Sequence, residues 1–496
     1  MSSTGRTIAK NATVLMASQL VTWGLTLVLT IFLPRYLGAA NVGKLQFANS
    51  MWAIVAVLVT FGMDTLLTKE IARAPERAVR LFGNTVIVRI GLHALGYVAL
   101  AVYLWLFRDR YPVETAYVVY IVGASSLVWQ FNSACQAVLQ GLERMEYISI
   151  ANAAGKAVNT LVCIAALLAG LGVYAVAVVT VVAALVTLAV ELVALRRLIG
   201  SLRLRFDWPE AARMLRASFP YLMSGVFLVI YMQVDIVIIS LLVDERAVGW
   251  YGTADQLFGT FLFIPTVFIT AVFPSLSRLY ATAADSLPRL MRKSWDLLLL
   301  LAIPIGLGVL VVADPLVVLL FGPEFAASGP ILALMGIVLI LTYQNILLGQ
   351  FLISTDRQNR WTIVMAVTAI VTVPLDFLLV PWCQRQFGNG AIGGALSFIV
   401  TELAMNIVGI WMLPRGSLGR SNVRVAVLGL AAGLAMVATT WPLRGSFLGL
   451  PIAVGAAIYV ALIVILRVLP AEDWQLMSSL ARGAARRVLG HRSASS

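Results

Sequence analysis

The chain has 496 residues, of which 60% are hydrophobic and only 12% are charged, and its mean hydropathy is +0.93. Soluble globular proteins contain roughly 45–50% apolar and about 25% charged residues, so this composition excludes a soluble enzyme, a secreted disulfide scaffold and a disordered chain. The net charge of +13 would suit a nucleic-acid ligand in a soluble protein, but here membrane topology explains its sign. We therefore expect a membrane protein without a nucleic-acid partner.

Fourteen apolar segments are each long enough to cross a bilayer, which needs about 20 residues per helix. The short polar stretch before the first segment and the lack of a small-residue cleavage pattern predict a retained helix rather than a secretory signal. The loops leave no room for a large soluble domain, so the predicted fold is an all-α polytopic membrane protein. In chain order the predicted spans are 11–34, 45–66, 82–107, 113–139, 148–170, 172–194, 217–243, 250–276, 295–320, 329–353, 361–381, 389–412, 422–441 and 448–467.

The basic residues are distributed unequally between the two sides of these spans. Of the 36 Lys and Arg residues, 27 fall in the terminal segments and every second loop, 7 fall in the other loops, and Arg89 and Lys156 lie inside spans. Cytoplasmic loops carry the excess of Lys and Arg, so both termini are predicted to be cytoplasmic, in the cytoplasmic membrane of a bacterium. A missed span would reverse the sides downstream, so the unequal distribution also supports the number of spans.

An internal repeat relates the two halves of the chain. Val42-Gly43 and Ala48 recur as Val248-Gly249 and Ala254, at a constant offset of 206 residues. An even number of spans separates the copies, so the halves share one orientation, as in transporters whose substrate path lies between two lobes. The predicted divisions are an N-terminal lobe (1–194), a cytoplasmic linker (195–216), a C-terminal lobe (217–412), two extra spans (413–467) and a basic tail (468–496).

The tail carries an apolar stripe at helical spacing, formed by Trp474, Met477 and Leu480, with Arg482 and Arg486 outside it. Such a pattern predicts an amphipathic helix that lies on anionic membrane lipids. A partly disordered basic tail is the alternative.

Three charged residues of the N-terminal half lie at bilayer depth, where a charge normally faces a cavity, forms a pair or lies near a helix end. Asp64 is near the end of the second span, where Lys69 is an available partner. Arg89 lies about a third of the way along the third span, and Lys156 lies beside Gly155 in the fifth. For both cations the interpretation is a water-filled cavity that holds a phosphate or diphosphate, with a structural ion pair as the alternative.

In the C-terminal half the charges inside spans are acidic. Asp235 lies at the centre of the seventh span, where it is expected to bind H⁺ or Na⁺ or to pair with Arg89 across the lobe interface. Asp255 lies one turn into the eighth span, where it could also cap or pair locally. For Asp376, which follows a proline, and for Glu402 a structural role is an equal alternative.

The residue types needed for membrane-enzyme chemistry are scarce. The chain has two histidines, His93 and His491, three scattered cysteines, and no Gly-Lys-Ser/Thr phosphate loop. These residues assemble neither a metal site nor a Ser-His triad. We therefore expect a transporter rather than an enzyme, with no cofactor beyond a coupling ion.

Short motifs follow one another along the chain in a characteristic order. They are Arg35-Tyr36-Leu37-Gly38, Val42-Gly43, Glu70-Ile71-Ala72-Arg73, Phe219-Pro220, Asp235-Ile236-Val237, Val248-Gly249-Trp250-Tyr251, Phe321-Gly322-Pro323-Glu324-Phe325, Pro374-Leu375-Asp376 and Gly390-Ala391-Ile392-Gly393-Gly394. Their order and spacing resemble the polysaccharide-biosynthesis flippases, which are oligosaccharide translocases of the multidrug/oligosaccharidyl-lipid/polysaccharide exporter superfamily. Asp376 departs from the pattern, since similar proteins usually have Asn near there.

The resemblance implies two six-helix lobes around a cationic cavity, two extra C-terminal helices, and alternating access for a polyprenyl-diphosphate-linked oligosaccharide. Arg89 and Lys156, with Arg35 from the shared motif, would bind the substrate. Coupling to H⁺ or Na⁺, or lobe closure, would fall to Asp235, Asp255, Asp64 and Glu402. By resemblance the partners would be a lipid-linked oligosaccharide for exopolysaccharide, O-antigen or capsule, membrane lipids, and the polysaccharide polymerase machinery.

Two other functions remain open. An ion-coupled exporter of drugs or small amphiphiles would have the same fold, although cavity cations argue against cationic drugs. A membrane glycan polymerase or ligase would need a catalytic cluster on the outer side, and the short outer loops argue against one.

Overall fold

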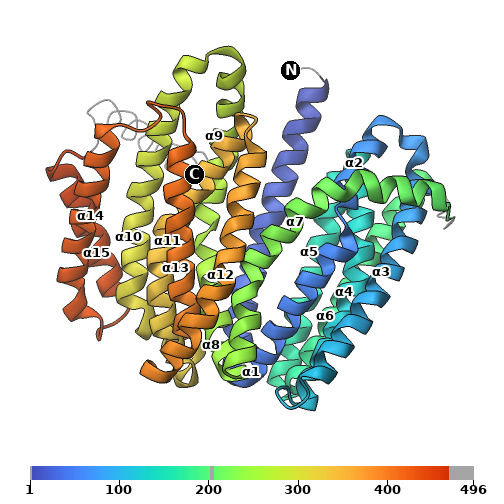
Figure 1. Cartoon of the computed structure of the whole chain (residues 1–496), viewed down its shortest axis with the longest axis horizontal. Coiled ribbons are helices and arrows are strands. Elements are labelled where there is room, and N and C mark those ends of the chain that lie inside the picture. Colours follow the sequence, from blue (N-terminus) through green and yellow to red (C-terminus); the bar gives the residue numbers. More distant parts are fainter. Residues whose placement is uncertain (1–2, 201–205, 469–496) are drawn as a thin grey trace, which may run out of the picture. The chain divides into compact units, whose positions relative to one another are not determined.

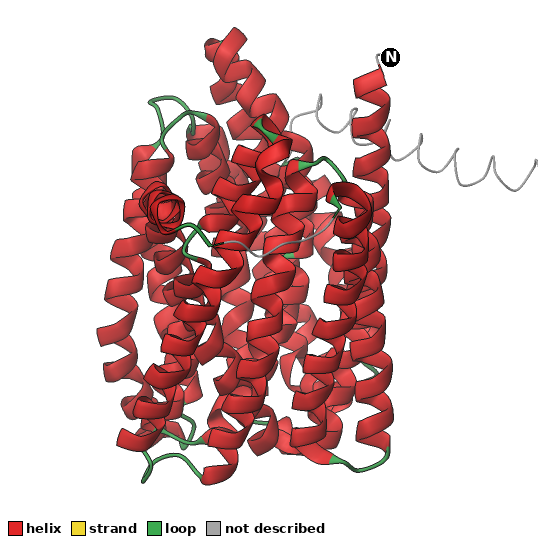
Figure 2. Cartoon of the chain, turned by 90° about the vertical axis from the view of Figure 1, so that its right-hand side faces the viewer, coloured by secondary structure: helices red, strands yellow, loops and turns green. Residues whose placement is uncertain are grey.

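The computed structural model describes residues 3–200 and 206–468. Within these ranges the chain forms helices joined by short loops and no β-strand (Figure 2). The predicted amphipathic helix of the tail lies outside the described residues. The elements in chain order are α1 (Ser3–Thr60), α2 (Met63–Arg73), η1 (Pro75–Arg77), α3 (Ala78–Leu106), α4 (Val113–Gly141), α5 (Met145–Leu168), α6 (Gly172–Ile199), α7 (Trp208–Leu242), α8 (Glu245–Phe261), α9 (Phe263–Thr282), η2 (Ala284–Ser286), α10 (Leu287–Phe321), η3 (Pro323–Phe325), α11 (Ser328–Ser354), α12 (Gln358–Phe387), α13 (Ala391–Met412), α14 (Arg420–Thr440), η4 (Trp441–Leu443) and α15 (Gly449–Ile465).

Twelve helical segments of the described chain are long and apolar enough to cross a membrane. The first of them, Thr22–Arg73, includes residues 22–34 of the first predicted span and all of the second. The shorter apolar helix α15 coincides with the last predicted span. Each of the fourteen predicted spans therefore corresponds to helix in the structure. The prediction of an all-α polytopic membrane protein is confirmed.

The first two predicted spans are joined by a backbone break rather than by a loop. Gly38 has φ 75° and ψ 166°, which interrupts α1 without ending it. A second break separates α1 from α2 at Phe61 and Gly62, both of which have positive φ. Gly62 also has no room for a side chain, because a Cβ there would approach the backbone of Ser218 and Leu222 in α7 to within 3 Å.

The described helices form two compact units. Unit 1 holds the chain up to Thr260 together with Val317–Leu332 and Asn359–Met405, and unit 2 holds Phe261–Leu316, Ala333–Gln358 and the described residues from Asn406 onward. Unit 1 thus combines helices from both halves of the sequence. The division into the two lobes 1–194 and 217–412 remains a prediction.

The main core cluster of unit 1 fills the space between α2, α3, α4 and α6, of which α3, α4 and α6 lie side by side in Figure 1. Its largest members are Leu67, Ile71, Phe82, Leu139 and Leu195, all buried. Inside a bilayer such a cluster is held by close van der Waals packing rather than by removal from water. This packing fixes the helices that carry Arg89 and Glu191.

A smaller core cluster holds unit 2 together. Ile303 and Leu307 of α10 pack against Ala432 and Met436 of α14, and Tyr459 of α15 joins them. α14 approaches α10 closely because a Cβ at its Gly433 would come within 2.7 Å of Ile303 and Leu307.

The internal repeat is visible as a reciprocal contact between α1 and α8. A Cβ added to Gly43 would overlap the backbone carbonyl of Glu245, and a Cβ added to Gly249 would overlap the carbonyl of Ala39. Gly43 and Gly249 are separated by 206 residues, and so are Ala39 and Glu245. Equivalent residues of the two repeats therefore meet across a local two-fold, in a contact that we call the glycine crossing. It supports the predicted parallel repeat in three dimensions.

Candidate functional site

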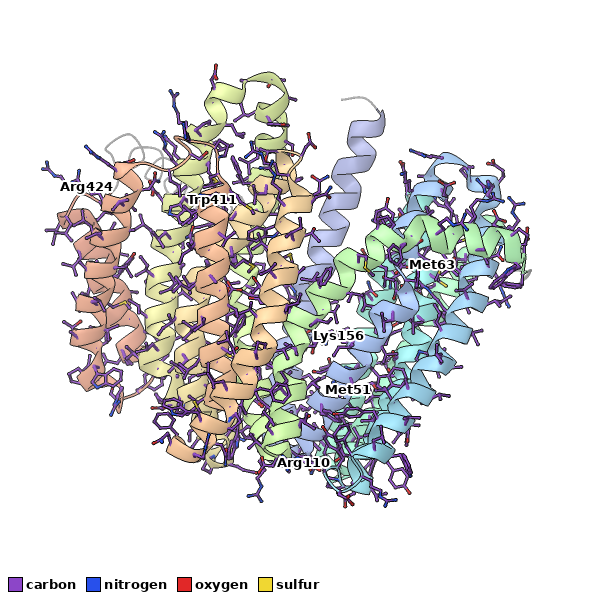
Figure 3. The ribbon with its side chains drawn as sticks, in the orientation of Figure 1. Met51, Met63, Arg110, Lys156, Trp411 and Arg424 are labelled. Carbon is purple, nitrogen blue, oxygen red and sulfur yellow. The ribbon has the colours of Figure 1, made fainter. Side chains whose placement is uncertain are left out.

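A cavity of about 730 Å³ lies inside unit 1, between α1, α4, α5 and α6. Three tryptophans, three asparagines and several Ser and Thr residues line it, and among the described lining residues only Lys156 carries a charge. Figure 3 shows Lys156 far from both ends of the helices, between the levels of Met63 and Met51, whereas Arg110 lies near the lower edge. The lining comprises Thr22, Trp23, Thr26, Asn49, Trp52, Ala53, Ala56, Val122, Ser125, Ser126, Trp129, Ile148, Ser149, Asn152, Gly155, Lys156, Asn159, Thr180, Ala183 and Thr187.

Lys156 is positioned by the close packing of α5 on α6. The neighbouring Gly155 is buried, and a Cβ there would overlap the Thr187 hydroxyl of α6. The Lys156 side chain is half-buried, and none of the ion pairs between described residues involves it. A cation at bilayer depth without an acidic partner is costly, so the cavity is suited to a ligand that brings its own negative charge.

Arg89 does not line the cavity. Its side chain is fully buried, Nη2 pairs with Asp64 Oδ1 at 2.6 Å, and Nη1 donates to the Gln130 carbonyl at 2.8 Å. The Ser133 hydroxyl accepts from Nη1 and donates to Asp64 Oδ2 at 2.5 Å. The expectation that Arg89 faces a water-filled cavity is therefore wrong, and its alternative, a structural ion pair, describes the residue.

The same network corrects two pairings expected from the sequence. Asp64 pairs with Arg89 of α3 rather than with Lys69, its neighbour along the chain. Asp235 does not pair with Arg89 either. The buried Arg89 guanidinium needs a counter-charge. Asp64 of α2 provides it, although the two residues are 25 positions apart in the sequence. Arg35, the third predicted substrate cation, is exposed beside the break at Gly38 and is absent from the cavity lining.

A pair of buried carboxyl groups joins α7 and α12. Asp235 Oδ2 accepts a hydrogen bond from the Tyr251 hydroxyl of α8 at 2.6 Å, and the Asp376 carboxyl of α12 lies near that of Asp235. Asp376 is fully buried and Asp235 is 8% exposed. Asp235 Oδ1 and both Asp376 oxygens receive no hydrogen bond from a donor in the described part of the chain. Two buried acids thus lie close together, and neither forms an ion pair with a basic side chain of the described residues.

Two further acidic residues predicted for the C-terminal half, Glu402 and Asp255, are not part of this pair. Glu402 of α13 is buried and accepts a hydrogen bond from the Tyr231 hydroxyl of α7 at 2.5 Å. Asp255 is half-buried on α8, one turn beyond Tyr251, and forms no salt bridge with a described residue. No group of three or more His, Cys, Asp or Glu residues in the described ranges is placed to hold a metal ion.

Glu191 of α6 is a buried acid that the sequence analysis missed. It has no exposed surface, and its Oε1 accepts a hydrogen bond from Gln136 Nε2 of α4 at 2.7 Å. The same Nε2 donates to Asn152 Oδ1 at 3.1 Å, and Asn152 lines the cavity. The signal was a single Glu in the apolar run of the sixth span. Glu191 lies close to the predicted end of that span, and the sequence there does not distinguish a buried glutamate from one at the membrane interface.

Polar contacts join the helix ends around the glycine crossing. Glu324 Oε1 of η3 accepts from the Ala39 amide at 3.0 Å, and its backbone carbonyl accepts from Trp250 Nε1 at 3.1 Å. Lys44 of α1 pairs with Glu114 of α4. These contacts give the Phe321–Phe325 motif a structural role, which is to connect α1 with α8.

The sequence of this chain is similar to that of proteins from one family. A family model described as "Polysaccharide biosynthesis protein" matches residues 8–280. Two proteins of Haloferax volcanii are similar: "Probable low-salt glycan biosynthesis flippase Agl15", 23% identical over 176 residues, and "Probable flippase AglR", 23% identical over 189 residues. The alignments cover 35% and 37% of this chain, and 36% and 38% of the relatives, so they span little more than a third of either relative.

Solved structures show the same fold. The lipid II flippase MurJ in an inward closed conformation superposes with a TM-score of 0.71 at 12% identity, over 91% of this chain and 98% of that one. A multidrug resistance transporter of the MATE family, which belongs to the MOP superfamily, superposes with a TM-score of 0.63 at 16% identity, over 79% and 93%.

Proposed function

Since the chain belongs to the polysaccharide biosynthesis protein family, we propose that it is a flippase that carries a polyprenyl-diphosphate-linked oligosaccharide across the cytoplasmic membrane by alternating access. The observation that carries this proposal is Lys156, which lies in a polar cavity inside the membrane-spanning helices and has no acidic partner among the described residues. The names of the two relatives, both flippases and one of them for glycan biosynthesis, support it.

The charge of the cavity selects an anionic headgroup. Lys156 presents a compact positive charge with three N–H donors, which suits the oxygens of a phosphate or diphosphate. With no acidic partner among the described residues, that charge is available to a ligand. A diphosphate brought into the cavity would gain an ion pair and would relieve the unfavourable burial of the lysine.

The rest of the lining suits sugars. The cavity volume of about 730 Å³ lies within the range of roughly 300–1,000 Å³ that is typical of small-molecule sites. Asn49, Asn152 and Asn159 offer amide donors and acceptors for hydroxyl groups. Trp129, 45% exposed, presents an aromatic surface on which the apolar face of a sugar ring can pack.

Coupling to an ion is the second part of the proposal and falls to Asp235 and Asp376. Two neighbouring carboxyl groups in an apolar interior disfavour being ionised together unless a cation joins them. We propose that this pair takes up H⁺ or Na⁺ and that its occupancy biases the conformational cycle. The oligosaccharide delivered to the other leaflet would be extended there by polymerase machinery, in exopolysaccharide, O-antigen or capsule assembly.

The test of the binding residue is transport in sealed proteoliposomes. A labelled polyprenyl-diphosphate oligosaccharide is incorporated, and its exposure to an added glycosidase is followed over time. Lys156→Met should slow translocation roughly 10- to 100-fold, the loss expected for one charged hydrogen bond of about 1.5–3 kcal/mol. Lys69→Met, which removes an exposed lysine of α2, is the matched control and should translocate at the wild-type rate. Equal rates for Lys156→Met and wild type would overturn the proposal.

A second candidate, an ion-coupled exporter of drugs or small amphiphiles, is favoured by the fold shared with the MATE transporter. It predicts that the same vesicles, without any glycan lipid, accumulate an amphiphilic dye when an H⁺ or Na⁺ gradient is imposed. The positive charge of Lys156 in the cavity argues against a cationic dye as substrate. Dye transport that is unaffected by Lys156→Met, together with no movement of the glycan lipid, would establish this candidate instead.

A further inference from the structure

Glu191 is a carboxyl group that the proposed mechanism leaves unused. It lies on α6 without exposed surface, and its Oε2 atom has no hydrogen-bond donor among the described residues. No basic side chain in the described ranges forms an ion pair with it. A carboxyl group in such surroundings requires either a proton or a cation.

A polar chain connects this carboxyl group to the cavity. Gln136 Nε2 donates one hydrogen to Glu191 Oε1 at 2.7 Å and the other to Asn152 Oδ1 at 3.1 Å. Asn152 lines the cavity and lies one helical turn before Lys156 on α5, so the two side chains share a face. On α6, the lining residue Thr187 lies one turn before Glu191. The carboxyl group therefore lies one residue layer behind the cavity wall.

We propose that Glu191 is a proton-binding site that regulates the cavity, and that its protonation, relayed by Gln136 and Asn152, increases the affinity of the cavity for an anion. Protonation adds one proton from the solvent and removes one negative charge from behind the wall. It also weakens the charge-assisted hydrogen bond from Gln136 Nε2 to Glu191, so that the Gln136 amide, which is bonded to Asn152 as well, is held less tightly behind the cavity wall. This inference rests on the proposed function, because it assumes that Lys156 binds the ligand phosphate.

Few other charged or titratable groups face Glu191 from the elements around it. Cys135 of α4 lies within electrostatic range. Lys156 of α5 faces the cavity, and Arg89 of α3 is already neutralised by Asp64. Arg196, on the last turns of α6, is exposed, as is Arg197. The described part of α1 adds no charged residue to the cavity lining. Glu191 is thus the acid whose protonation changes the charge behind the cavity wall.

The test measures binding of farnesyl diphosphate to the purified full-length protein by isothermal titration calorimetry, at mildly acidic and mildly alkaline pH. The wild-type affinity should rise on acidification more than that of Glu191→Gln, which carries no titrating carboxyl group. The difference should be roughly fivefold or more, the lower end of typical coupling between two sites. Titration of the probe itself is common to all variants and cancels in this comparison. Glu143→Gln, in the exposed turn between α4 and α5, is the control and should behave as wild type.

The remaining outcomes separate this inference from the proposed function. If Lys156→Met binds the probe as wild type does, the assignment of the binding site fails. If Lys156→Met loses binding while Glu191→Gln keeps the wild-type pH dependence, the function stands and the role of Glu191 is overturned.

Infrared difference spectroscopy gives a readout that does not depend on transport. Acidification should increase the carbonyl band of protonated carboxyl groups in wild type. The part of this increase that belongs to Glu191 should be missing from the difference spectrum of Glu191→Gln, while any part from Asp235 and Asp376 remains. If that variant fails to fold, Gln136→Met, which retains the acid and breaks the link, should keep the band but lose the pH dependence of binding. A band in Glu191→Gln with the full intensity of wild type, or unchanged pH dependence in Gln136→Met, would contradict the proposal.

Discussion

Two basic side chains inside the membrane-spanning helices have opposite environments. Arg89 is fully buried and held by the Asp64 carboxylate, the Gln130 carbonyl and the Ser133 hydroxyl. Lys156 is half-buried in a polar cavity and has no acidic partner in the described part of the chain. Because a paired charge is satisfied by the protein and an unpaired one is not, we expect removal of Arg89 to destabilise the fold, and we assign ligand binding to Lys156.

The Arg89–Asp64 pair makes a prediction about stability. Arg89→Met should destabilise the protein by about 3 kcal/mol, at the lower end for a broken buried pair because a third of the Asp64 side chain is exposed. The double variant Arg89→Met/Asp64→Asn should recover part of this loss, since no charge is then left without a partner. Thermal melting in detergent measures both effects, with Lys69→Met as control. An unchanged melting temperature for Arg89→Met would refute the structural role.

Among the glycines of the described residues, an added Cβ would come nearest to another atom at Gly43, in the glycine crossing of α1 and α8. Gly43 and Gly249 let each helix touch the carbonyl of the other, and the side chain of Glu324 secures the Ala39 amide beside them. Backbones approach this closely only where the side chain is absent. The crossing joins equivalent residues of the two repeats, so any motion of one repeat relative to the other changes it.

A glycine outside the crossing provides the matched comparison for a packing prediction. A Cβ at Gly43 overlaps the backbone of Glu245, whereas a Cβ at Gly259, also on α8, meets nothing within 4 Å. Gly43→Ala should therefore cost about 1–3 kcal/mol through overpacking, while Gly259→Ala should be neutral or gain up to about 1 kcal/mol from helix propensity. Thermal melting of the two variants decides the matter, and equal melting temperatures would contradict the close contact.

At the scale of the whole molecule, membrane-spanning helices account for most of the described chain, and its fold is that of MurJ and the MATE transporter. The split of basic residues, 27 against 7, predicts which loops face the cytoplasm. The three native cysteines, Cys135, Cys163 and Cys383, are buried. Cysteines introduced into loops are therefore specific reporters of sidedness.

The topology prediction uses two such reporters in intact cells. A cysteine in place of Arg444, between the last two predicted spans, should react with a membrane-impermeant maleimide added from outside. A cysteine in place of Arg289, between the eighth and ninth, should react only after the membrane is opened. The reverse pattern would place the termini outside and would invert the predicted direction of transport.

The contacts that the sequence analysis missed join residues that are far apart in the chain. Lys69 is the partner that the sequence offers Asp64, because the two are neighbours along the chain, yet Asp64 pairs with Arg89 on another helix. Asp235 faces Asp376 across 141 positions, and Glu191 meets the cavity only through Gln136 of α4. Hydropathy reports how deep a residue lies in the membrane, but it carries no information on which helix faces which.

The sequence by itself determined the helical membrane fold, the positions of the spans and the 206-residue repeat, because apolar length and a constant offset are properties of the chain read in order. Only the tertiary structure decided which cation is paired and which has no acidic partner among the described residues, that two acids lie close together, and that a third lies behind the cavity wall. These properties depend on contacts between helices, and in an apolar interior the partner of a charge decides whether it stabilises the fold or binds a ligand.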